Sequence, residues 1–273
     1  MNLTGAIQLV HRLITSTVCE SVFKEVRTTE RARKWTLEAM VSFWVAIVTR
    51  APPSLRAALD ECFGKGVASA LSFESAPSSF FERSQNLRWQ FFQEIFKRFI
   101  AALVQECRAD FDAALREKLP AFPEIWIVDG SGLDRVRRRL KDLWGVEEVV
   151  IPGSVLACYD LYRGIVRVLE FHEKLLGGEA SRLRALLDEI PRGTLLVADR
   201  GYSSARLLGA VALKNLHALV RLKRTHVLHA VEELGRHLQD GCEVLDRIVT
   251  MGTGGKKPVQ VRVRIIEKFL PDG

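Results

Sequence analysis

Two short apolar runs, each followed directly by an aspartate, constrain the fold of this chain more than any other feature. Residues 125–128 read Ile-Trp-Ile-Val and lead into Asp129, and residues 195–198 read Leu-Leu-Val-Ala and lead into Asp199. Such a run is typical of a strand that is covered on both faces and is therefore central in its sheet. In open α/β sheets, ligands bind beyond the carboxyl ends of such strands. We therefore expect Asp129 and Asp199 to meet at one edge of a sheet and to hold a hard divalent cation.

The segments around these runs predict an α/β fold with a mixed sheet. Apolar and alternating stretches predict strands, and two longer amphipathic stretches predict helices. In chain order the strands lie at 125–128, 155–159, 165–171, 195–199 and 218–220, and the helices lie at 179–190 and 203–215. Residues 160–164 form a hairpin turn in which Gly164 is free to take a positive φ. A hairpin combined with a right-handed crossover favours a mixed sheet over an all-parallel one.

The residues before and after this core differ from it in pattern. Residues 1–120 are predicted to be helical, with Ser54 as the N-cap of a helix that begins at Leu55 and with 80–119 as one long helical tract. Loop signals lie at 51–54, 64–66 and 76–79. In the C-terminal part, 243–250 and 258–269 alternate around a glycine-rich turn, which predicts an antiparallel hairpin. The predicted domains are a helical region at 1–120, an α/β core at 121–225 and a β-rich insertion at 226–273.

Charge and cysteine content narrow the class of protein. The 273 residues carry a formal charge of +7, which suits a polyanionic partner without proving one. The five cysteines form no C-x-x-C pair, which argues against a disulfide framework and for a reducing, cytoplasmic setting. No signal peptide is evident, and the most apolar segment, 37–48, is too short to cross a membrane and contains Glu38. We therefore expect a cytoplasmic protein.

Three short motifs in this core resemble those of a known family. They are Val128-Asp129-Gly130-Ser131, Tyr159-Asp160-Leu161-Tyr162-Arg163-Gly164 and Ala198-Asp199-Arg200-Gly201-Tyr202. In this order and on these strands they resemble the DDE transposases of bacterial insertion sequences, specifically the insertion-sequence-four group. The resemblance covers about residues 120–225 well and implies an RNase H-like mixed sheet with flanking helices.

The resemblance also implies an activity. Asp129 and Asp199 would be the first two catalytic, metal-binding acids, and they would use Mg²⁺ or Mn²⁺ to cleave and rejoin phosphodiester bonds. The implied partner is DNA, at the terminal inverted repeats of the transposable element, and a homodimer is an open expectation. By position, the helical region 1–120 is the candidate for binding the DNA ends.

The third acid of that family has no counterpart in this sequence. The family carries it as a glutamate in a Y-x-x-R-x-x-x-E signature, on a helix that follows a β-rich insertion, and no such signature follows Arg224. We therefore expect a C-terminally truncated transposase that lacks the final catalytic helix and whose activity is impaired. The alternative is a non-catalytic DNA-binding remnant of a transposase. A phosphatase that uses Asp129 as nucleophile fits poorly, because Ser131 stands where a second aspartate is needed.

Several basic residues and one tyrosine are candidates for binding DNA. Arg135, Arg137, Arg138, Arg139 and Lys141 form one cluster, Arg221 and Lys223 form a second, and Arg200 and Tyr202 flank the second acid. Each set fits a contact with the phosphate backbone, and each also fits a solvated face or a packing role.

The acids have structural alternatives as well. Asp129 could be only a turn residue, Asp199 could be an acid at a helix N-terminus or a partner of Arg200, and Asp160 fits a hairpin turn better than a metal site. Histidines 226, 229 and 237 with Cys242 match no standard zinc spacing.

Overall fold

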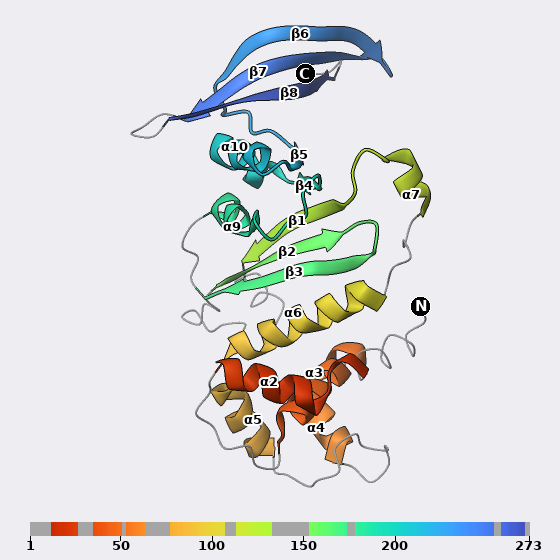
Figure 1. Ribbon diagram of the computed structural model, residues 1–273, viewed down its shortest axis with the longest axis vertical. Coiled ribbons are helices and arrows are strands. Elements are labelled where there is room, and N and C mark those ends of the chain that lie inside the picture. Colours follow the sequence, from red (N-terminus) through yellow and green to blue (C-terminus); the bar gives the residue numbers. More distant parts are fainter. Residues whose placement is uncertain are drawn as a thin grey trace. The chain divides into compact units, whose positions relative to one another are not determined.

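The structure, a computed structural model, describes residues 12–26, 35–50, 53–63, 77–106, 113–132, 153–173, 178–253 and 258–270 (Figure 1). The chain divides into two compact units, Met1–Arg108 and Ala109–Gly273. None of the helices in the described ranges combines the length and the apolar composition that a membrane-spanning helix needs.

The first unit is helical. Its described elements are α2 (Ser16–Val26), α3 (Leu37–Arg50), α4 (Leu55–Phe63), α5 (Pro77–Asn86) and α6 (Trp89–Glu106). Phe80 and Phe91 are fully buried in its core, where Phe80 packs edge-on against Trp35 and Phe43. The predicted N-cap is confirmed, because Ser54 Oγ accepts a hydrogen bond of 3.0 Å from Ala57 N at the start of α4.

The tract predicted for 80–119 is largely helical in its described residues, but it is interrupted at 87–88, between α5 and α6; residues 107–112, before α7 (Ala113–Lys118), lie outside the described residues. The break between α5 and α6 places buried Leu87 at the turn, so that both helices direct aromatic side chains into one core. The loop predicted at 76–79 is also wrong in part. Pro77 opens α5, at the first helical position, where the missing N–H of proline costs no hydrogen bond.

The second unit contains the mixed five-stranded sheet that the sequence predicted. Its strands are β1 (Ile125–Gly132), β2 (Ser154–Asp160), β3 (Ile165–His172), β4 (Leu195–Ala198) and β5 (His217–Val220). They lie in the order β3-β2-β1-β4-β5, with β2 antiparallel to both of its neighbours and with β1, β4 and β5 parallel. The predicted fold class, an α/β protein with a helical N-terminal region and a mixed sheet, is therefore confirmed. Gly164 takes its predicted positive φ, of 68°, in the β2–β3 hairpin.

Two helices cover one face of this sheet. Leu183 and Leu186 of α9 (Glu179–Leu186) and Leu207 and Val211 of α10 (Ala205–Leu213) pack in one core with the strand residues Trp126, Val128, Leu156, Cys158 and Leu196. On the opposite face, Ile127 is 39% exposed. In the described residues of this unit, the apolar run of β1 is therefore not buried on both faces, unlike the sequence-based expectation, because alternate side chains of a strand point to opposite faces.

A second, antiparallel sheet follows, in the order β6 (Leu228–Gln239), β7 (Cys242–Thr253), β8 (Val259–Phe269). The predicted hairpin is β7–β8. Strand β6 was not predicted, because its pairing with β7 shifts register at two places and most of its side chains are exposed. Helix α10 lies beside this sheet as well as the first one, with Gly209 facing Val259 of β8 (Figure 1).

Candidate metal centre

The two aspartates lie at the same level on neighbouring parallel strands. Val128 of β1 is paired with Ala198 of β4, so Asp129 and Asp199 each follow the last pair of this register. Both side chains are exposed at the carboxyl edge of the sheet. The structure therefore brings the two acids to one edge, as the apolar runs predicted.

Strand β1 continues beyond its first acid. The sequence placed the end of this strand at Val128, but β1 runs to Gly132 because β2 pairs with it as far as Ser154. Asp129 lies within this ladder, opposite Ala157, and its Oδ1 accepts a hydrogen bond of 2.9 Å from Gly130 N. The alternative in which Asp129 is only a turn residue is therefore wrong.

Asp199 has a local structural role in addition to its place at the edge. It caps the short 3-10 helix η2 (Arg200–Tyr202), where its Oδ1 accepts a hydrogen bond of 2.6 Å from Gly201 N. The alternative of an acid at a helix N-terminus is thus realised in part. A carboxylate has about four lone-pair sites, so one hydrogen bond leaves capacity for a cation.

A third acid, Glu179, lies at the same edge. It is the first residue of α9, and its side chain lies close to both Gly130, which follows Asp129, and Gly201, which follows Asp199 after one residue. A Cβ added at Gly201 would lie 2.7 Å from Glu179 Oε2 and 2.8 Å from Asp199 Oδ1, so the separation of these two oxygens cannot exceed the sum of the two distances. Glu179 does not stand out in the sequence, because acids are common in the first turn of a helix, where they interact favourably with the helix dipole.

Tyr202 lies beneath the acids. Its side chain is 1% exposed and belongs to the core of the sheet, which favours the packing role over a contact with DNA. Burial, followed by the negative charges of Glu179 and Asp129, raises the pKa of Tyr202 well above its usual value. The neutral hydroxyl is therefore a hydrogen-bond donor at neutral pH.

The structure describes only some of the basic residues that are candidates for binding DNA. Arg221 directly follows Val220, which is paired with Ala198, so Arg221 stands in the same row as the two aspartates. Arg221, Lys223 and Arg200 are all exposed. The cluster Arg135, Arg137, Arg138, Arg139 and Lys141 lies outside the described residues.

Asp160 is far along the sheet from these acids, at the amino end of β1, where it is paired with Trp126. It is fully buried and accepts hydrogen bonds from Arg163 Nη1 (2.8 Å) and Arg167 Nη1 (3.2 Å). Glu124 forms ion pairs with the same two arginines. We call Glu124, Asp160, Arg163 and Arg167 the hairpin charge cluster; its closed pairing supports the structural reading of Asp160.

The carboxylate oxygens of Asp129 and Asp199 are of the type that a hard cation prefers, but they do not surround an ion completely. In the described part of the chain, no three Asp, Glu, His or Cys side chains are arranged so that they could enclose a metal ion. Mg²⁺ does not need such a cage, because it retains several waters and is commonly bound through one or two carboxylates and substrate phosphate. Asp129 and Asp199 therefore suit Mg²⁺ as a pair of ligands, whereas the described residues form no site that would coordinate the ion by protein atoms alone.

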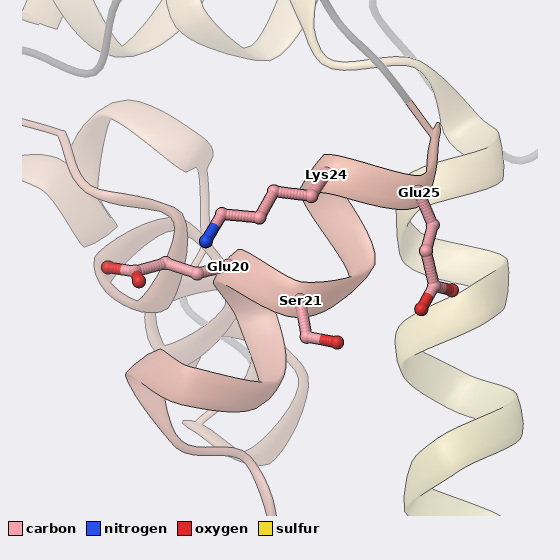
Figure 2. A pocket seen from close by; sticks show the side chains of 4 residues that line it. All are labelled: Glu20, Ser21, Lys24 and Glu25. Atoms are coloured by element: carbon pink, nitrogen blue, oxygen red, sulfur yellow. The ribbon is translucent and has the colours of Figure 1, made fainter.

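A shallow hollow in the helical unit, of about 430 Å³, is a weaker candidate site. It is lined by Glu20, Ser21, Lys24 and Glu25 of α2, and Figure 2 shows Lys24 extending toward Glu20. Arg98 of α6 donates hydrogen bonds to Ser21 Oγ and Glu25 Oε1. The hollow lies beside a polar helix–helix contact with charges of both signs, which selects for no ligand class.

Comparison with known proteins bears on the second unit. Residues 156–266 match the family model of the transposase DDE domain. The matched segment begins in β2, includes Asp199 and ends in β8, and Asp129 lies before it. The search of curated proteins returned no match.

Among solved structures, one match is a piggyBac transposase, described as a synaptic complex with hairpin DNA. The identity is 8% and the TM-score 0.33, with 94% of this chain and 59% of that chain covered. The chain thus spans less than two thirds of the length of that transposase.

Proposed function

We propose that this chain is a DNA transposase of the DDE type, of the insertion-sequence-four group, whose metal-binding acids include Asp129 and Asp199. The observation that supports the proposal is the register of β1 and β4, in which the residues before the two aspartates, Val128 and Ala198, are paired, within a unit whose residues 156–266 match the transposase DDE domain. The proposed cofactor is Mg²⁺ or Mn²⁺, and the proposed partner is DNA at the ends of the transposable element.

The proposed reaction is an in-line attack of water or a 3′-hydroxyl on a phosphodiester phosphorus, in which one P–O bond forms and the P–O bond to the leaving strand breaks. Bound divalent cations supply Lewis-acid stabilisation of the attacking and leaving oxygens. Asp129 and Asp199 hold and orient the ions, and their exposure leaves the edge open to a DNA strand. Their main-chain hydrogen bonds limit the rotation of both carboxylates.

Arg221 and Lys223 are proposed to contact the DNA backbone. Arg221 stands beside the acids in the same row of strand ends, so a phosphate held by it would lie next to the ions. Contacts of this kind position the DNA and make its affinity depend on salt. Arg200 and the cluster 135–141 are proposed as further backbone contacts, and the helical region 1–120 as the part that binds the transposon ends.

The family's third acid, a glutamate on a helix, has no counterpart among the described residues after Arg224, which form β6, β7 and β8. The proposal therefore rests on the first two acids, Asp129 and Asp199.

The test is a Mn²⁺-dependent cleavage assay on DNA that carries the terminal repeats of the element. Asp129→Asn and Asp199→Asn should each lower the rate roughly a hundredfold or more, since metal stabilisation supplies several kcal/mol. Asp188→Asn is the control, because Asp188 is an exposed acid of the same unit that pairs with Lys214. Binding of the repeats with no metal-dependent cleavage by the unchanged chain would instead favour the non-catalytic DNA-binding remnant.

A further inference from the structure

The side chain of Glu179 lies close to the backbone next to both aspartates. A Cβ added at Gly130 would lie 3.0 Å from Glu179 Cγ, and one added at Gly201 would lie 2.7 Å from Glu179 Oε2. Gly130 follows Asp129 directly, and Gly201 follows Asp199 after one residue. At both positions a residue larger than glycine would displace the side chain of Glu179. The carboxylate of Glu179 reaches the same edge as the two aspartates although it comes from a different element, α9.

The Tyr202 hydroxyl is a second, independent observation. It is buried, and it has no hydrogen-bond partner in the structure. A Cβ added at Gly130 would lie 3.0 Å from this oxygen, and the same point lies 3.1 Å from Glu179 Cδ. Buried hydroxyls are normally hydrogen-bonded, because an unsatisfied donor in a dry environment costs free energy. This hydroxyl is directed at the acids, so it points to a ligand-dependent hydrogen bond there.

We propose that Glu179 is a third acidic residue of the metal centre, which accepts hydrogen bonds from waters bound to the cation, and that the Tyr202 hydroxyl orients its carboxylate. This inference rests on the proposed function, because Asp129 and Asp199 are the direct ligands. Glu179 acts through water because no three acids of the described residues are placed to enclose an ion.

The chemistry of Mg²⁺ and Mn²⁺ makes such a residue effective. Two carboxylates leave most of the six coordination positions to water and phosphate, and the coordinated waters are strong hydrogen-bond donors that need acceptors. Groups in this position orient the direct ligands, and their loss commonly lowers metal affinity 10–100-fold. The electrostatics agree, because a cation bound beside Glu179 and Asp199 would attract both carboxylates.

The test measures Mn²⁺ affinity of the full chain by calorimetry, without DNA and without an activity readout. Glu179→Gln should weaken Mn²⁺ binding roughly 10–100-fold. Tyr202→Phe should weaken it by a smaller factor, since the ligands themselves stay in place. Glu189→Gln is the matched control, because Glu189 is an exposed acid just beyond the other end of α9 and its loss removes the same charge.

A second readout separates this role from a merely structural one. Glu179→Gln should gain less in Tm on addition of Mn²⁺ than the unchanged chain and Glu189→Gln do, because the gain in Tm follows the affinity of the folded protein for the ion. If Glu179→Gln and Glu189→Gln bind Mn²⁺ alike while Asp199→Asn loses it, the inference is wrong and the proposed function stands. If Asp129→Asn and Asp199→Asn bind Mn²⁺ as well as the unchanged chain, both are wrong.

Discussion

The hairpin charge cluster gives a prediction that separates a structural acid from a metal ligand. Asp160 belongs to a motif shared with the transposases that this sequence resembles, and it lies on the same sheet as the candidate centre. If it is structural, Asp160→Ala should destabilise the second unit and leave Mn²⁺ affinity unchanged. If it binds metal, the reverse should be observed.

The size of the destabilisation follows from the contacts. The side chain of Asp160 is fully buried and accepts from Arg163 N as well as from the guanidinium groups of Arg163 and Arg167. Removal of one partner of a buried ion pair costs about 3–5 kcal/mol. Glu124 still holds both arginines, and their side chains are 22% and 17% exposed, so water and Glu124 offset part of the loss. We therefore expect a loss at the lower end, about 3 kcal/mol.

Thermal and urea unfolding followed by circular dichroism measure this loss. For a unit of this size, about 3 kcal/mol corresponds to a fall in Tm of roughly 6–12 °C. The control is Asp188→Ala, because the side chain of Asp188 is 75% exposed in its pair with Lys214. Such surface pairs contribute about 1 kcal/mol or less. A loss under about 1 kcal/mol for Asp160→Ala, or a weakened Mn²⁺ affinity, would refute the structural assignment.

Three further predictions follow from particular backbone positions and one thiol. Gly201→Ala should leave Tm nearly unchanged but weaken Mn²⁺ binding, because the added Cβ displaces the flexible ends of Glu179 and Asp199. The control is Gly235→Ala, whose added Cβ meets nothing within 4 Å. Equal Mn²⁺ affinities of the two variants would contradict the reasoning. Gly241→Ala should cost about 1–2 kcal/mol in urea unfolding, because Gly241 has a φ of 73° in the β6–β7 turn, and an unchanged midpoint would count against that turn. Burial, with the charges of Glu38 and Glu20, raises the pKa of Cys19 from 9.0 to about 11. Between pH 9 and 11 the thiol of Cys19 thus keeps its proton in the folded state and loses it in the unfolded state, so the free energy of unfolding should fall as pH rises through this range. Cys19→Ala should make this decline less steep. An equally steep decline in both proteins would refute the prediction.

Part of the fold could be predicted because local pattern decided it. The apolar runs before Asp129 and Asp199 predicted β1 and β4, and the pattern around Gly164 predicted the β2–β3 hairpin; each needs only the period of its own side chains and the chemistry of its turn. Because β1 and β4 run parallel, the residues that precede the two aspartates, Val128 and Ala198, can pair with each other.

Other elements depended on contacts that pattern does not contain. Strand β6 is an edge strand with irregular pairing, so its sequence lacks a regular alternation, although Asp240 and Gly241, both with positive φ, mark the turn after it. The break between α5 and α6 lets both helices pack aromatic side chains into one core. Glu179 was missed because its role depends on where α9 begins relative to two strand ends that are distant from it in sequence.

The two ends of β1 show how one sheet carries acids in two different roles. At the amino end, Asp160 and Glu124 are matched by Arg163 and Arg167, so the charge is neutralised within the protein and contributes to stability. At the carboxyl end, among the residues that the structure describes, no lysine or arginine forms an ion pair with Asp129 or Asp199. Two carboxylates near each other without a basic partner are unfavourable in the protein alone, and a bound divalent cation makes their arrangement favourable. The same side-chain type is therefore structural where the protein supplies the counter-charge, and we propose that it is functional where the cation must supply it.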